Sequence, residues 1–217
     1  MNPRALLFVA LVSWPAPASA DEPALVQFTQ VDDTTAKWST VSSENGITLE
    51  RRAVPGSRFN EYRAFTVIPM VPERVASVVW TALREGDMSN LTHRQVLRET
   101  PTELVMYDQI HAPVVSDRDY TLTVHRITDP AHGRTEFRGA TSNELGPPPA
   151  PGHVRIPVIR AGWLVEPDGA GGTRLVCFSY SEPGGLLGAW LVRGAQAKGA
   201  VADVVRMSRR LAALRDR

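Results

Sequence analysis

The sequence has few residues of the types that carry covalent or metal chemistry. Its one cysteine, Cys177, excludes an intramolecular disulfide. Because Cys177 lies between Val176 and Phe178 in an apolar stretch, we expect a buried thiol rather than a nucleophile. The five histidines lack His-x3-His spacing, and the glycine-rich piece DGAGG lies between two expected strands as a turn, not as a phosphate loop. We therefore expect no metal, no cofactor and no catalytic residue.

Long hydrophobic runs are also missing. Residues 1–20 contain Arg4, the short run ALLFVALVSW and the ending PAPASA, which is the pattern of a signal peptide. No later segment approaches the roughly 20 apolar residues of a transmembrane helix. We expect cleavage after Ala20, export of residues 21–217, and the periplasm as their destination.

The charges are balanced. Residues 1–20 hold one of the 24 basic residues and none of the 23 acidic ones, so the expected mature chain has 23 of each. A net charge near zero without a basic stripe argues against a nucleic-acid partner. The chain from residue 21 onward is long enough for one core, and no repeat or long linker divides it. We expect one domain and a monomer.

Apolar alternation predicts a mostly antiparallel sheet. A hairpin is expected at 47–68, with its turn at Pro55–Ser57. Two helices are expected before the later strands, a short one at 34–43 around Trp38 and one at 72–85 that begins with Pro72. Further strands, joined by short turns that favour antiparallel neighbours, are expected at 93–100, 103–110, 120–127, 134–140, 154–166 and 173–181.

From Gly184 onward, apolar residues recur at helical spacing over about thirty residues, from Leu187 to Leu211. One long helix beside many antiparallel strands predicts an α+β helix-grip fold, in which the sheet curls around the helix. The segment GAQAKGA inside this helix consists mostly of small residues. It is explained either by close packing of the helix on the sheet or by a void between them, which binds an apolar ligand.

Four motifs in this order resemble the START domain, a lipid-transfer module: GITLERRAVPGS, PVVSDRDYT, GHVRIPVIRAGWLVEPDGAGGTRLVCFSY and PGGLLGAWL. The resemblance covers most of Trp38 to Arg210. It implies a helix-grip fold around one lipid, closed by the last helix and by the loop before Arg118. Sterol-binding members often carry a buried acid and a buried arginine on the strands beside this loop. The matching positions here are Val105 or Tyr107 and Val124, which disfavours a sterol.

The cluster Asp117, Arg118 and Asp119 is either a reactive centre or a brace for the loop. The resemblance favours the brace, since the family's matching Arg-Asp pair lies at the foot of the lid. It also implies an apolar tip of the lid that touches a membrane. The residues expected in the lid and at the membrane are Pro113, Val114, Val115, Asp117, Arg118, Asp119, Leu186 and Leu187.

Aromatic and apolar residues of the strands and of the last helix are expected to line the pocket, and Arg155 to meet a ligand head group. The full expected set is Tyr107, Arg155, Trp163, Phe178, Tyr180, Trp190, Val201 and Val205. The expected partners are one lipid or other hydrophobic small molecule and, transiently, a membrane surface. Two alternatives stay open: an enzyme of the cyclase or hydrolase type, with ionisable groups converging in the pocket, and a sensor or chaperone that does not transfer its ligand.

Overall fold

The computed structural model describes residues 36–88, 90–113, 115–185 and 189–215, with residues 189–193 as backbone only. The expected signal peptide lies outside the described residues. So do Val114, Leu186 and Leu187 and the side chain of Trp190.

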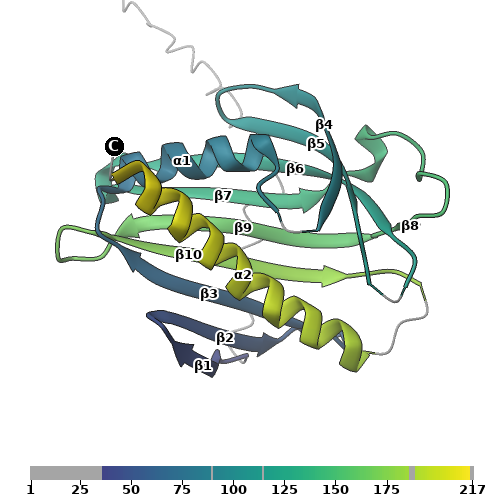
Figure 1. Ribbon diagram of the computed structural model, residues 1–217, viewed down its shortest axis with the longest axis horizontal. Coiled ribbons are helices and arrows are strands. Elements are labelled where there is room, and N and C mark those ends of the chain that lie inside the picture. Colours follow the sequence, from purple (N-terminus) through teal and green to yellow (C-terminus); the bar gives the residue numbers. More distant parts are fainter. Residues whose placement is uncertain (1–35, 89, 114, 186–188, 216–217) are drawn as a thin grey trace, which may run out of the picture.

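One curved sheet forms most of the molecule (Figure 1). Its neighbouring strands follow the order β1-β2-β3-β10-β9-β7-β6-β5-β4, and each pair along this path is antiparallel. A short strand, β8, pairs in parallel with the start of β6. The strands are β1 (Ser39–Glu44), β2 (Ile47–Ala53), β3 (Asn60–Ile68), β4 (Leu91–Glu99), β5 (Glu103–Ile110), β6 (Arg118–Asp129), β7 (Arg134–Thr141), β8 (Val154–Arg155), β9 (Val158–Pro167) and β10 (Thr173–Glu182).

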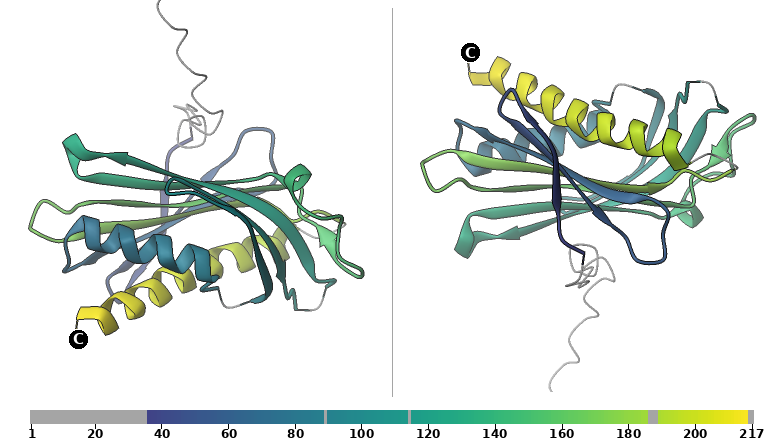
Figure 2. Two further views of the ribbon diagram at one scale, coloured as in Figure 1. Left: turned by 90° about the horizontal axis from the view of Figure 1, so that it is seen from above. Right: turned by 90° about the horizontal axis from the view of Figure 1, so that it is seen from below.

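Two α-helices of the described part lie on one side of this sheet, and β4 and β5 curl toward them (Figure 2). Helix α1 (Pro72–Glu85) begins with proline in its first turn and ends at Gly86, whose φ of 80° suits glycine. Helix α2 (Ala189–Arg215) crosses β3 and β10. Neither helix is long and apolar enough to cross a membrane.

The core lies between the sheet and the two helices. Helix α2 contributes a stripe of buried residues, Ala200, Val204, Met207 and Leu211, at the spacing of one helix face. Opposite this stripe, strands such as β10 contribute Leu175 and Cys177, which are buried. The helix-grip fold predicted from the sequence is confirmed.

The short helix expected at 34–43 is wrong. Residues 39–44 form β1, an edge strand that pairs with β2. β-Branched and small polar residues such as Thr40 and Val41 fit an extended edge better than a helix. The ring of Trp38 lies under the guanidinium groups of Arg52 on β2 and Arg63 on β3, at 4.6 and 4.3 Å, which fixes the chain beside the sheet.

Candidate ligand-binding cavity

A cavity of about 480 Å³ is lined by the middle of α2, the end of α1 and the strands β4 to β7, β9 and β10. Most of its wall is apolar or aromatic. Trp163 of β9, Phe178 of β10 and Phe137 of β7 line it from the sheet, and Met207 lines it from α2. Its volume lies in the range of small-molecule sites, about 300–1,000 Å³. The cavity can therefore hold the apolar body of a small molecule.

Small residues of α2 leave the room for this cavity. Ala195, Gly199 and Ala202 line it, one turn apart along the helix. A Cβ atom placed on Gly194 or on Gly199 meets no atom within 4 Å, so neither glycine allows a close approach of the sheet. Both glycines are exposed and Gly199 also lines the cavity, so close packing on the sheet does not explain them.

A buried ion pair forms part of the wall on the side of β4 and β5. Arg94, which lines the cavity, donates from Nε to Oδ1 of Asp108 at 2.6 Å and from Nη2 to Oδ2. Its Nη1 donates to the carbonyl oxygen of Leu83, and Asp108 has no solvent-exposed surface. The two residues lie directly opposite each other on β4 and β5. All three guanidinium nitrogen atoms of Arg94 thus donate hydrogen bonds within the protein.

Sequence reasoning missed this pair. The family's buried acid and buried arginine match positions on β5 and β6, where this chain has Val105, Tyr107 and Val124. All three residues are buried. The signal for the pair is the register of the β4–β5 hairpin, which sets Arg94 opposite Asp108.

Helix α2 also brings one carboxyl group to the cavity, that of Asp203. Burial raises its pKa from 3.8 to about 6, against the opposing charge of Arg206. Tyr120 and Cys177 line the same cavity, and burial raises the pKa of each well above its ordinary value. Both therefore stay protonated at neutral pH, as expected from the sequence for the Cys177 thiol.

Asp119 holds four segments together below the loop that precedes β6. Its carboxylate accepts hydrogen bonds from Arg155 Nε at 2.8 Å, from the Tyr107 hydroxyl at 2.9 Å and from the Ala150 amide at 2.7 Å. Arg155 also donates to the carbonyl oxygen of Pro147. Although burial opposes it, these donors hold the pKa of Asp119 below its usual range. The ion-pair partner of Asp119 is Arg155, not Arg118, which donates to the Ser116 carbonyl oxygen.

Asp117 braces the loop from the other side. Its Oδ1 accepts from the Ala112 amide at 3.0 Å and lies 2.9 Å from His111 Nδ1. The Ala112 hydrogen bond, with His111 beside it, lowers the pKa of Asp117. At the tip, Pro113 is exposed and lines the cavity, whereas Val115 is half-buried. The arrangement is that of a loop fixed at both ends beside the cavity.

The residues expected in the pocket lie in different surroundings. Trp163 and Phe178 line the cavity. Tyr107 and Arg155 belong to the Asp119 cluster instead, and Val201 packs against the core. The cavity wall, as far as the structure describes it, does not include Tyr107, Arg155, Tyr180, Val201 or Val205.

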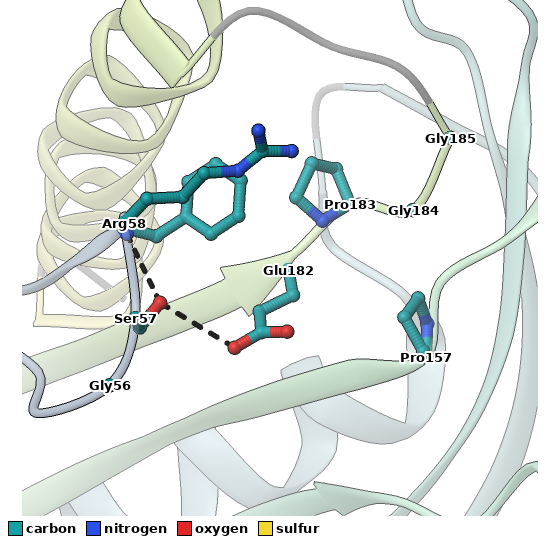
Figure 3. A pocket seen from close by; sticks show the side chains of 9 residues that line it. Gly56, Ser57, Arg58, Pro157, Glu182, Pro183, Gly184 and Gly185 are labelled. Atoms are coloured by element: carbon teal, nitrogen blue, oxygen red, sulfur yellow. Dashed lines mark hydrogen bonds between the residues drawn. The ribbon is translucent and has the colours of Figure 1, made fainter.

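A second, more open pocket of about 390 Å³ lies at the end of β10 and includes Ser57 and Glu182 in its wall (Figure 3). Tyr180 does not line this pocket but is hydrogen-bonded to both residues. Its hydroxyl donates to Glu182 and lies 2.9 Å from Ser57 Oγ, and burial, followed by the hydrogen bond to Glu182, raises its pKa. Ser57 Oγ also accepts from the Phe59 amide and lies 3.5 Å from Glu182. These bonds join the β2–β3 turn to the end of β10 and have a structural role.

Known proteins resemble this chain over most of its length. The START domain family model matches residues 20–217. Phosphatidylcholine transfer protein of Rattus norvegicus is 25% identical over 170 residues, which cover 76% of this chain and 79% of the relative. An uncharacterized protein of Pseudomonas aeruginosa is 26% identical over 161 residues, 71% of this chain and 76% of that one.

Solved structures agree with the sequence matches. The STAR-related lipid transfer protein fragment of Xanthomonas axonopodis superposes with a TM-score of 0.71 at 25% identity, covering 80% of this chain and 98% of the fragment. Human StAR-related lipid transfer protein 5 has the same fold, with a TM-score of 0.75 at 22% identity over 88% and 95% of the two chains. With its family model matched from residue 20 to the end, the chain belongs to the START domain family.

Proposed function

We propose that this START domain binds one hydrophobic molecule, a lipid, in the cavity beneath α2 and carries it between membranes. The observation that carries the proposal is the cavity of about 480 Å³ with apolar walls, roofed by the small residues of α2. Relatives named as lipid transfer proteins support the same activity.

The energetics of lipid release make such a carrier useful. Bringing a lipid chain of about 16 methylenes into water costs on the order of 13 kcal/mol, at about 0.8 kcal/mol for each methylene. Unaided exchange across an aqueous space is therefore very slow. A cavity as apolar as the membrane makes the transfer nearly neutral in free energy, so no chemical step is required.

An enzyme needs more than the cavity offers in its described residues. Arg94 is engaged by Asp108, and Asp87 pairs with Arg206 and Arg210. Asp203 has no hydrogen bond to a second ionisable side chain that would complete an acid–base pair. The large exposed apolar side chains of the described part are single residues on separate segments, which favours a carrier over a chaperone with an apolar docking patch.

The proposal extends to the membrane and the compartment. The loop of residues 111–117, with its exposed proline at the cavity mouth, would contact a bilayer during loading and release. Residues 1–20 would direct the chain to the periplasm, and the protein would act there as a monomer.

The test is native mass spectrometry of the exported protein, with identification of whatever co-purifies. We expect one lipid per chain, and we expect Ala202→Trp to abolish it, because Ala202 lines the cavity. Ala213→Trp, on an exposed position of the same helix, is the control and should keep the lipid. A wild-type protein that is free of lipid and stays so after incubation with vesicles would contradict the proposal.

A further inference from the structure

The wall of the cavity carries hydrogen-bond acceptors that the described part of the protein leaves without donors. The first is Oε1 of Gln196 on α2, a buried atom without a hydrogen-bond partner there. The orientation of this amide is fixed, because Nε2 lies 2.7 Å from the carbonyl oxygen of Ser181, which can only accept. The oxygen atom is therefore the one left unpaired.

The second acceptor is the carboxyl group of Asp203, seven residues further along α2. Seven residues are two helical turns, so the two groups share one face of α2, about 10 Å apart. Both residues line the cavity, and Gly199 and Ala202 lie between them on the same wall. No hydrogen bond joins the Asp203 carboxyl to another group of the described residues.

The cationic and phenolic donors Arg94, Tyr120 and Lys198, which line the cavity, are by contrast already engaged or exposed to solvent. Arg94 is bound to Asp108 and Leu83. Tyr120 directs its hydroxyl to the sulfur of Met88, at 3.9 Å. Lys198 is exposed to solvent, where its charge is screened. Among the described residues, an anionic group therefore finds no free cationic partner inside the cavity, whereas the two acceptors are open to a donor.

We propose that Asp203 and Gln196 select a ligand that carries a hydrogen-bond donor, a hydroxyl or amino group on an apolar body, and reject one that carries an anionic group. This inference rests on the proposed function and names the class of its ligand. A hydroxyl or amino donor satisfies one of the two unpaired acceptors, which lie too far apart to share it, whereas a carboxylate or phosphate brings a like charge to Asp203.

The charges around Asp203 set how this selection depends on pH. Arg206 on α2 opposes it, and Asp87, before β4, has the same sign. Across the cavity lie Tyr120 on β6 and Cys177 on β10, both uncharged at neutral pH, and the neutralised pair of Arg94 on β4 with Asp108 on β5. Lys198 and His111 also line the cavity, and both are exposed to solvent. Above pH 6 Asp203 is ionised without a hydrogen-bonded partner among the described residues, and a cationic amine is then held most tightly.

The test compares three single-chain probes of equal length, 1-hexadecanol, 1-hexadecylamine and hexadecanoate. The cavity volume corresponds to roughly 16 groups of the size of a water molecule, at about 30 Å³ each, which suits one such chain. Dissociation constants are measured by displacement of the uncharged fluorophore N-phenyl-1-naphthylamine. At pH 8 we expect the alcohol and the amine to bind at least tenfold more tightly than the acid.

Variants of Asp203 separate the two parts of the proposal. Asp203→Asn keeps an acceptor and removes the charge, so it should weaken the amine at least tenfold and spare the alcohol. Asp203→Leu removes both and should weaken the alcohol as well. Lowering the pH from 8 to 5 should weaken the amine in the wild type and not in Asp203→Asn. Glu144→Gln, an exposed carboxylate elsewhere, should change none of these values.

The outcomes are distinguishable. Equal affinity of the wild type for alcohol and acid, or an unchanged ranking in Asp203→Asn, would overturn the selection while leaving the carrier intact. If neither the fluorophore nor any of the three probes entered the cavity, the proposed function itself would be wrong.

Discussion

At the scale of single residues, Asp203 is placed where it lowers the stability of the fold. Its pKa of about 6 exceeds the ordinary 3.8, so the folded protein holds the proton more tightly than the unfolded chain does. Below about pH 4 the group is protonated in both states and has no cost. As the pH rises through 6 the folded state bears the full penalty, up to about 3 kcal/mol at 1.36 kcal/mol for each pKa unit.

We therefore expect Asp203→Asn to raise the free energy of unfolding by up to about 3 kcal/mol at pH 8 and to leave it unchanged at pH 3.5. Urea denaturation at the two pH values measures the difference. Glu144→Gln, which removes an exposed carboxylate, serves as the control. An equal effect of Asp203→Asn at both pH values would show that the charge of Asp203 is not the source. A residue that costs stability inside a cavity is best explained by a role in binding.

The residues of the cavity were predictable only in part. Trp163 and Phe178 were expected because the inner face of a helix-grip sheet is both core and pocket wall, so some of its aromatic residues should line the pocket. Tyr107 and Arg155 bind instead to the buried carboxylate of Asp119, which lies 12 and 36 positions away from them in the sequence, and no local pattern reveals such contacts. Asp203 was not predicted, because the sequence alone does not show whether a polar residue on a long helix faces solvent or a neighbouring strand.

At the scale of elements, the open space beside α2 can be tested through its glycines. A Cβ atom on Gly199 meets nothing, so Gly199→Ala should stabilise the protein by about 1 kcal/mol through helix propensity alone. Gly162 on β9 gives the contrast, because its Cβ would strike the carbonyl oxygen of Phe137 on β7. Gly162→Ala should therefore destabilise, by about 1–3 kcal/mol. Thermal unfolding of both variants is the measurement, and a loss of stability in Gly199→Ala would restore the close-packing explanation.

Most helices and strands were predicted correctly from the spacing of their apolar residues, and the wrong predictions have local causes. Strands β5, β6, β7 and β10 were predicted because each alternates between turns. The expected strand at 154–166 is divided into β8 and β9, since Pro157 lacks the amide hydrogen that a continuous ladder needs. The segment that became β1 has too few apolar residues to show either period, and its pairing with β2 decided its conformation.

At the scale of the whole molecule, the helix-grip fold was predictable because one long helix and many short-linked strands leave few ways to bury the apolar faces. The cavity was not predictable, because its volume is the space that the surrounding side chains leave empty. Glycine and alanine on α2 gave the only sequence signal for it, and they were equally consistent with tight packing, which the structure rules out because a Cβ atom on Gly194 or Gly199 meets nothing within 4 Å.

Transfer by the whole molecule requires that the mouth of the cavity meet a bilayer, and Val115 is placed to report on it. This half-buried valine lies in the loop that Asp117 braces beside the cavity. Val115→Glu should slow transfer of lipid between vesicles at least tenfold, because a charge at the contact must be dehydrated, while binding in solution is kept. Val67→Glu on β3, where the valine is 58% exposed on another part of the sheet, is the matched control. Equal transfer rates for the two variants would place the docking surface elsewhere, and loss of binding in Val115→Glu would assign the loop to the cavity wall instead.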